Sequence, residues 1–165
     1  MAQVGSATTS KALSILTAPT GLPFSVMTIS EREKVKLAEI SPAQVFGQNI
    51  AFDLAERSVG VSYPVVYVYC EKIANLLREK FRTFSGRAHM IVEVRVSQDR
   101  LEGLERQMQL YVEAVTEVLD AHRGDWGQGM FYTGGYEVSF GPVKHGGRNL
   151  IQAAKLEFEV EVSMN

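Results

Sequence analysis

The side chains in this sequence that could act as acids, bases or metal ligands are few and far apart. The histidines are His89, His122 and His145, and they show neither an H-E-x-x-H arrangement nor any similar ligand spacing. We interpret them as surface or loop residues rather than as a metal centre. Cys70, the only cysteine, ends an apolar run in which cysteine usually behaves as a small hydrophobe. We therefore expect no catalytic residue, no cofactor and no metal, and hence no enzyme.

Two glycine-rich stretches invite comparison with phosphate-binding loops. Neither residues 124–129 (GDWGQG) nor residues 141–147 (GPVKHGG) match G-x-x-x-x-G-K-[ST]. Each also lies between strand signals rather than ahead of a helix, where a phosphate loop must sit. We interpret both stretches as connections between strands.

Carboxylates are concentrated on one face of a strand predicted near the C-terminus. Apolar and charged residues alternate strictly from residue 155 to residue 162, which gives one apolar face and one charged face. The acidic residues are Glu157, Glu159 and Glu161. A solvated sheet face is one interpretation. In a ring, the same glutamates would form a lumen face that keeps a passing polyanion from sticking.

Aromatic residues gather in two places, in an apolar run at residues 64–70 and around the first glycine-rich stretch. Tyrosine and tryptophan are favoured anchors at protein interfaces, and they are equally ordinary core residues. Both interpretations stay open. The candidates for a subunit or partner interface are Tyr67, Tyr69, Trp126, Phe131 and Tyr132.

The clearest part of the scaffold is residues 88–124. Residues 88–97 alternate with period two, which predicts a half-buried strand. Asp99 and Glu102 then match a capping box, and Gly124 can end the helix that follows. Apolar residues recur between them at steps of three and four, which predicts a long amphipathic helix packed on one face of the sheet. They are Leu101, Leu104, Met108, Tyr111, Val115 and Val118.

The remaining elements complete an α+β pattern. Residues 64–70 are apolar throughout, which predicts a strand covered on both faces. A short helix is predicted from the spacing of apolar residues in 73–81, and a further strand at 136–140. Strand, helix, strand, helix, strand, strand indicates an α+β fold with a mostly antiparallel sheet.

The N-terminal part is expected to be an arm rather than a part of the α+β domain. Residues 1–30 are rich in Ser, Thr, Gly and Pro around small apolar clusters, and such a segment seldom folds alone. We divide the chain into an extended N-terminal arm with short helices at 1–60, packing on the domain or on a neighbouring subunit, and an α+β domain at 61–165. Deleting residues 1–29 is expected to leave the subunit folded. Residues 43–57 stay ambiguous.

The length, composition and charge of the chain argue against some classes of protein. The chain has 165 residues, of which 45% are hydrophobic and 22% charged, as in ordinary globular domains. Its formal net charge of −2 argues against a protein that coats nucleic acid. No apolar run approaches the roughly 20 residues of a membrane span, so we expect a soluble, cytoplasmic chain with no membrane partner.

Several local strings, taken with the order of elements, carry a family resemblance. They are residues 63–69 (YPVVYVY), 84–87 (FSGR), 97–102 (SQDRLE), 134–138 (GGYEV), 146–149 (GGRN) and 152–160 (QAAKLEFEV). Together they span the chain from residue 63 to its end, and they resemble the tail-terminator and tail-completion proteins of long-tailed bacteriophages. The first sixty residues are not covered by the resemblance.

The resemblance implies a structural virion protein, assembled in the host cytoplasm, with no catalytic residues to transfer. Such subunits form a homo-oligomeric ring, usually a hexamer, at the head-proximal end of the tail. The ring ends tail-tube growth and joins the tail to the head connector at the neck. DNA passes through its lumen without specific binding. The alternatives are another neck or baseplate component, or a monomeric adaptor that pairs an exposed sheet edge with a peptide.

Overall fold

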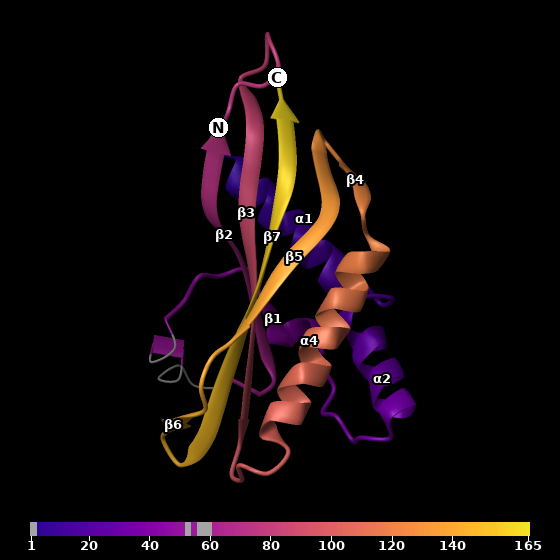
Figure 1. The fold of residues 1–165 in the computed structure, drawn as a ribbon, viewed down its shortest axis with the longest axis vertical. Coiled ribbons are helices and arrows are strands. Elements are labelled where there is room, and N and C mark those ends of the chain that lie inside the picture. Colours follow the sequence, from indigo (N-terminus) through magenta and orange to yellow (C-terminus); the bar gives the residue numbers. More distant parts are fainter. Residues whose placement is uncertain (1–2, 52–53, 56–60) are drawn as a thin grey trace.

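The computed structural model describes residues 3–51, 54–55 and 61–165 (Figure 1). The helices whose bounds are described are α1 (Val4–Thr17), α2 (Leu22–Glu33), the short 3-10 helix η1 (Pro42–Gln44) and α4 (Leu104–Ala121). The strands are β1 (Val45–Phe46), β2 (Val65–Asn75), β3 (Phe84–Gln98), β4 (Gly124–Gly127), β5 (Met130–Phe140), β6 (Lys144–Gly146) and β7 (Asn149–Met164).

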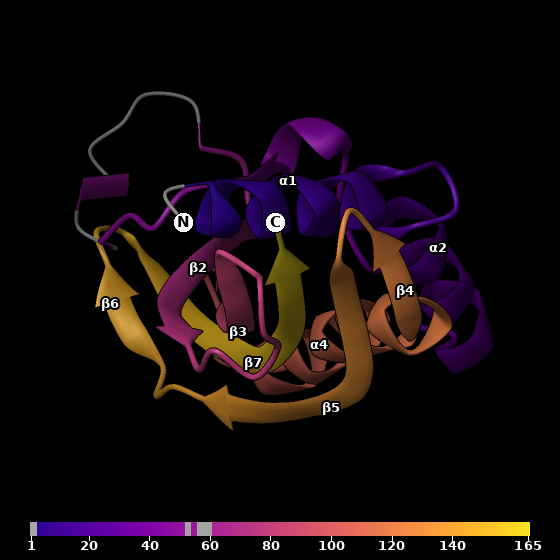
Figure 2. The same ribbon diagram turned by 90° about the horizontal axis from the view of Figure 1, so that it is seen from above.

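These strands form one sheet in the order β1-β2-β3-β7-β5-β4, with β6 paired to β7. The β1–β2 pair is parallel and the other pairs are antiparallel, which confirms an α+β fold with a mostly antiparallel sheet. The longest pairing joins β3 to β7, from Phe84 opposite Met164 to Gln98 opposite Leu150. The sheet is curled (Figure 2), as expected from the intrinsic twist of strands.

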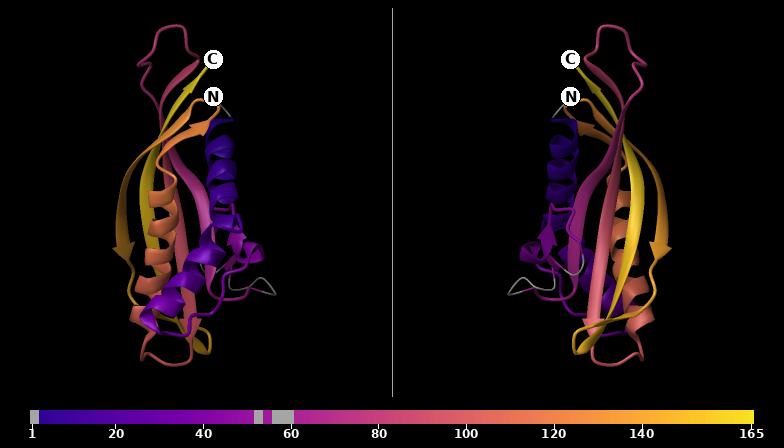
Figure 3. Two further views of the ribbon diagram at one scale, coloured as in Figure 1. Left: turned by 90° about the vertical axis from the view of Figure 1, so that its right-hand side faces the viewer. Right: turned by 90° about the vertical axis from the view of Figure 1, so that its left-hand side faces the viewer.

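The main core lies between the sheet and the helices, which cover one face of β3 and β7 (Figure 3). Alternate residues of both strands enter it, and none of them is more than 4% exposed. They are Met90, Val92, Val94 and Val96 on β3 and Leu156, Phe158, Val160 and Val162 on β7. The period-two patterns therefore identify the core face of both strands correctly.

The opposite face of β3 is more enclosed than the half-buried strand predicted from the sequence. Ile91 is 1% exposed and belongs to a second apolar cluster with Tyr67, Tyr69 and Ala55. Ile50, Val61 and Tyr63 pack against this cluster, so a segment between β1 and β2 covers that part of the sheet. As predicted, both faces of residues 65–69 of β2 are buried.

The boundaries predicted for the helix after β3 are wrong. α4 begins at Leu104, after Gly103 in a left-handed conformation and without a side-chain cap. The Gln98 side chain donates to the carbonyls of Arg100 and Glu102, which shapes residues 99–102 as a turn and leaves Leu101 64% exposed. At the other end α4 stops at Ala121, because Gly124 already belongs to β4.

The short helix predicted at residues 73–81 is also wrong. β2 continues to Asn75, paired with β3 as far as Gly86, and residues 76–83 form the connection between the two strands. Apolar spacing suggested a helix here, but Ile73, Leu76, Leu77 and Phe81 are 37–99% exposed. They have no buried face to give to a helix.

Residues 4–33 form two helices of 14 and 12 residues, where an extended arm with short helices was predicted. Their buried residues are part of the main core: Val4, Ala12, Ile15, Leu16, Leu22, Val26 and Ile29. Gly21 allows the sharp turn between α1 and α2, because a Cβ there would lie 2.4 Å from the carbonyl oxygen of Ile15. In the ambiguous stretch 43–57, β1 occupies residues 45–46; the boundary proposed at residue 60 lies outside the described residues.

α2 is tied to α4 by polar contacts as well as by apolar packing. The hydroxyl of Ser25 donates to the carbonyl of Ala114 at 3.1 Å. Arg32 donates to Glu113 at 2.5 Å and to Glu117 at 2.9 Å. We therefore treat α2 as an integral part of the folded body.

Two buried tyrosines make the stability of the folded subunit depend on pH in the alkaline range. Burial raises the pKa of Tyr111 and of Tyr132 to about 12. Between the ordinary phenol pKa of about 10 and that value, the unfolded chain loses the proton while the folded chain keeps it. Stability is therefore full below about pH 10 and falls as pH rises toward 12. We expect the melting temperature to drop steadily across this interval.

The matched variant is Tyr111→Phe. It removes one titrating phenol and also the hydrogen bond of 2.9 Å from the Tyr111 hydroxyl to the carbonyl of Ala38. We expect it to be less stable at pH 8 by about 1 kcal/mol, but to lose stability less steeply above pH 10. A wild-type melting temperature that stays constant up to pH 11.5 would contradict the assignment.

Candidate functional site

The polar side chains of interest lie on the face of the sheet opposite the helices, which we call the outer face. Strand side chains alternate between faces, so the neighbours of the core residues on β3 and β7 all point there. The register places His89 opposite Glu159 and Glu93 opposite Lys155. These pairings depend on which strands are adjacent, and the sequence alone could not show them.

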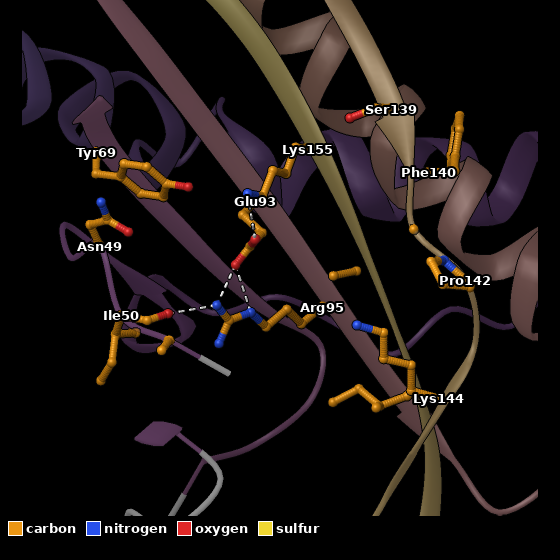
Figure 4. Close-up of a pocket in the computed structure, with 14 residues that line it drawn as sticks. Asn49, Ile50, Tyr69, Glu93, Arg95, Ser139, Phe140, Pro142, Lys144 and Lys155 are labelled. Atoms are coloured by element: carbon orange, nitrogen blue, oxygen red, sulfur yellow. Dashed lines mark hydrogen bonds and ion pairs between the residues drawn. The ribbon is translucent and has the colours of Figure 1, made fainter. Parts of the chain in front are cut away.

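Glu93 and Arg95 form an ion pair that is almost completely enclosed. Glu93 is 6% exposed and Arg95 is 4% exposed. The Arg95 Nε donates to the Glu93 carboxylate at 2.7 Å, and its Nη2 donates to the carbonyl of Ile50 at 2.7 Å (Figure 4). The guanidinium also lies 4.4 Å from the centre of the Tyr67 ring. The pair thus ties the segment around Ile50 to the middle of the sheet.

This ion pair lines a hollow of about 460 Å³ on the outer face. Lys144 and Lys155 also line it, and Lys155 Nζ lies 3.9 Å from the Glu93 carboxylate (Figure 4). Phe140, Pro142 and Ile151 contribute apolar surface. Because cations outnumber carboxylates in its lining, we call it the basic hollow.

A second hollow, of about 490 Å³, lies further along β7. Its lining includes four carboxylates and one histidine: Glu71, Glu137, Glu157, Glu159 and His89. Glu137 lies directly opposite Glu157 on neighbouring strands, an arrangement that is destabilising unless a cation approaches. We call this the acidic hollow.

The connection between β2 and β3, residues 76–83, projects beyond the end of the sheet near the C-terminus (Figure 1). We call it the hairpin tip. Phe81 is 99% exposed and Leu77 is 66% exposed. Both adopt left-handed backbone conformations, with φ of 65° and 47°, which cost bulky residues roughly 1–2 kcal/mol each. Strain of this kind is concentrated at functional positions.

The hairpin tip is held in one arrangement by hydrogen bonds. The Asn75 side chain accepts from the backbone N–H of Leu77 at 3.3 Å and of Ser85 at 3.2 Å. The Glu79 carboxylate accepts from the Ser163 hydroxyl on β7 at 3.0 Å. The exposure of Phe81 is therefore built into the fold.

The structure buries four of the five aromatic residues named as interface candidates. Trp126 and Tyr132 pack in the main core with ring centres 5.6 Å apart. Tyr67 and Tyr69 lie in the second cluster, 3% and 9% exposed. Only Phe131 reaches the surface, at 47% exposure. Aromatic type alone did not separate these positions, because tyrosine and tryptophan suit cores and interfaces alike.

The three glutamates named as a lumen face lie on the outer face, and two of them have cations beside them. Glu159 pairs with Arg87 at 3.1 Å and lies 3.2 Å from the His89 ring, and Glu161 pairs with Arg78 at 3.5 Å. No ion pair involves Glu157 within the described residues. The outer face therefore carries charges of both signs, and the glutamate without an ion pair among the described residues, Glu157, lies in the acidic hollow.

The histidines and the cysteine are placed as follows. His89 lies in the acidic hollow, the His122 side chain contacts the carbonyl of Val118 at 2.7 Å, and His145 lies on β6. Burial raises the pKa of the Cys70 thiol, which disfavours the reactive thiolate. In the part of the chain that the structure describes, His, Cys, Asp and Glu form no group of three suited to a metal ion.

The residues that sequence reasoning missed are those of the hairpin tip and the buried ion pair. The sequence patterns at these positions were visible, but each of them fitted more than one structure. Alternation placed Glu93 and Arg95 on the same face of a strand, without showing that another segment covers them. The apolar residues of the tip matched helical spacing, and only the β2–β3 register shows that they are exposed.

Comparisons with other proteins name no family for this chain. No protein-family model matches it, and no characterised protein matches its sequence closely enough to count as a relative. Among the described helices, none is by itself long and apolar enough to cross a membrane; α1 and α2 reach that length and composition only together, across a bend of 42°.

Proposed function

We propose that this chain is a structural subunit of a bacteriophage virion. Copies of it assemble into a homo-oligomeric ring, a hexamer, at the head-proximal end of the tail. There the ring ends tail-tube growth and joins the tail to the head connector, and DNA passes through the lumen without specific binding. The sequence resemblance from residue 63 to the end supports this role.

The hairpin tip is the observation that carries the proposal. The tip holds a bulky apolar side chain, Phe81, 99% exposed on a strained and anchored loop, away from the core of its own subunit. Exposed apolar groups of this kind mark surfaces that other proteins cover. Leu76 and Leu77, 48% and 66% exposed, enlarge the apolar surface around Phe81.

Further exposed apolar residues are spread over other parts of the subunit. Phe24 and Met27 on α2 are 52% and 48% exposed, and Phe131 and Phe140 on β5 are 47% and 49% exposed. A subunit in a ring needs two different contact surfaces, one for each neighbour, and more where tail and connector dock. Surfaces on separate elements suit that arrangement.

The direct test is the mass of the purified protein in solution. We expect size-exclusion chromatography with light scattering to give a single oligomer near six times 18.3 kDa, and negative-stain electron microscopy to show rings with an open centre. Added tail tubes should be capped at one end. A monomer at every concentration up to the millimolar range would rule out the ring.

The second candidate is a monomeric adaptor that binds a peptide at a sheet edge. β4 pairs with β5 only between Met130 and Tyr132, so residues 136–140 of β5 pair on one side alone within the described structure. An open edge can accept an added strand. The same light-scattering experiment separates the two candidates, because an adaptor remains a monomer.

A further inference from the structure

We propose that the hairpin tip of one subunit docks in the acidic hollow of a second copy. This inference rests on the proposed ring and supplies the contact that would build it. The two surfaces lie on different parts of the subunit. The tip projects beyond the end of the sheet (Figure 1), whereas the hollow is lined by outer-face residues such as His89, Glu157 and Glu159.

Charge complementarity favours this pairing over the other large hollow. The tip carries Arg78, Lys80 and Arg82 against the single carboxylate of Glu79. Arg78 and Arg82 already pair with Glu161 and Glu79, whereas no ion pair involves Lys80 within the described residues. The basic hollow, with two lysines in its lining, would repel this tip.

The acidic hollow lacks the countercharge that the tip would bring. Glu71, Glu137 and Glu157 line it, and none of them has an ion pair among the described residues. Glu137 and Glu157 face each other across adjacent strands, and like charges so placed are destabilising. An arriving Lys80 ammonium would relieve that repulsion, as oppositely charged patches do across interfaces.

The apolar side chain of the tip adds to the fit. The backbone of Gly135 lines the acidic hollow, and no side chain obstructs approach there. Phe81 would pack over this backbone, and aromatic residues of this kind act as interface anchors. The hydrogen bonds that hold the tip reduce the entropy lost on docking.

A tip cannot reach the hollow of its own subunit, because the tip is anchored to β7 at the end of the sheet. The contact must therefore join two copies through unlike surfaces. Heterologous contacts of this kind produce closed rings when the rotation between subunits closes. This assignment replaces the lumen role that the sequence suggested for Glu157 and Glu159.

The test uses two variants of the full chain, each of which blocks one surface. Phe81→Asp blocks the tip and Glu137→Lys blocks the hollow; both positions are exposed, so the fold should be kept. We expect each variant alone to be monomeric, with subunit association weakened roughly thirty-fold or more. An equimolar mixture should give a heterodimer and nothing larger, because only one intact tip can meet one intact hollow.

Two further variants serve as controls. Lys36→Glu reverses an exposed charge away from both surfaces and should assemble like the wild type. The charge swap Lys80→Glu with Glu137→Lys in one chain should assemble better than Glu137→Lys alone.

Each outcome decides between the two proposals. Wild-type rings together with normal assembly of Phe81→Asp would overturn the tip contact and leave the ring intact. Variants that are both monomeric but do not combine would show that tip and hollow are not partners. A wild type that remains a monomer would remove both proposals.

Discussion

Replacing Arg95 with alanine is expected to destabilise the folded subunit by about 3–5 kcal/mol. The reason is the enclosure of its partner: Glu93 is 6% exposed, and the change would leave its carboxylate buried without the guanidinium. Breaking one side of a buried ion pair has a cost of that size. The change would also remove the hydrogen bond to the carbonyl of Ile50 and the contact with the Tyr67 ring. Urea unfolding followed by circular dichroism measures the effect.

Arg87 provides the matched control on the same strand and face. Its guanidinium pairs with Glu159 at 3.1 Å, but with side chains 36% and 41% exposed. Surface pairs contribute at most about 1 kcal/mol, so Arg87→Ala should be nearly neutral. Equal losses for the two variants would mean that the Glu93–Arg95 pair is not enclosed as described. Replacing both members of the buried pair by apolar residues should cost less than Arg95→Ala alone.

Deleting residues 1–33 is expected to abolish folding, which opposes the expectation from the sequence that the subunit would fold without residues 1–29. The deletion removes the apolar side chains that α1 and α2 place in the main core and exposes the face of α4 beneath them. Burying a large aliphatic side chain contributes about 1.5–3 kcal/mol, whereas the net stability of a domain is about 5–15 kcal/mol. The truncated chain should therefore show no cooperative unfolding transition.

Single substitutions on α2 give the same answer without truncation. Leu22 is fully buried, and Leu22→Ala should destabilise the full chain by about 2–5 kcal/mol. Phe24, two residues away and 52% exposed, is the matched control and should lose little stability on change to alanine. A truncated chain that melts at the wild-type temperature would show that α1 and α2 are dispensable.

The sequence by itself determined parts of β2, β3, β5 and β7, and the direction of the side chains on β3 and β7. It did not predict β1, or β4 and β6 within the two glycine-rich stretches. Period-two alternation at residues 88–97 and 155–162 requires only local backbone geometry, and both stretches lie in strands whose core faces were assigned correctly. The α+β class followed from the order of such patterns. These features depend on residues that are close together in the sequence, so the sequence is sufficient to predict them.

Only the tertiary structure decided which polar and aromatic residues are buried and which are exposed on the surface. Alternation places Glu93 and Arg95 on one face of a strand. That face would be exposed without the segment around Ile50, which covers it. Tyr67 and Phe81 are both aromatic, yet one is 3% exposed and the other 99%. Residues 73–81 have helical spacing but belong to a hairpin, because pairing with β3 outweighs a weak local preference. Burial is fixed by contacts between distant segments, and no local pattern encodes them.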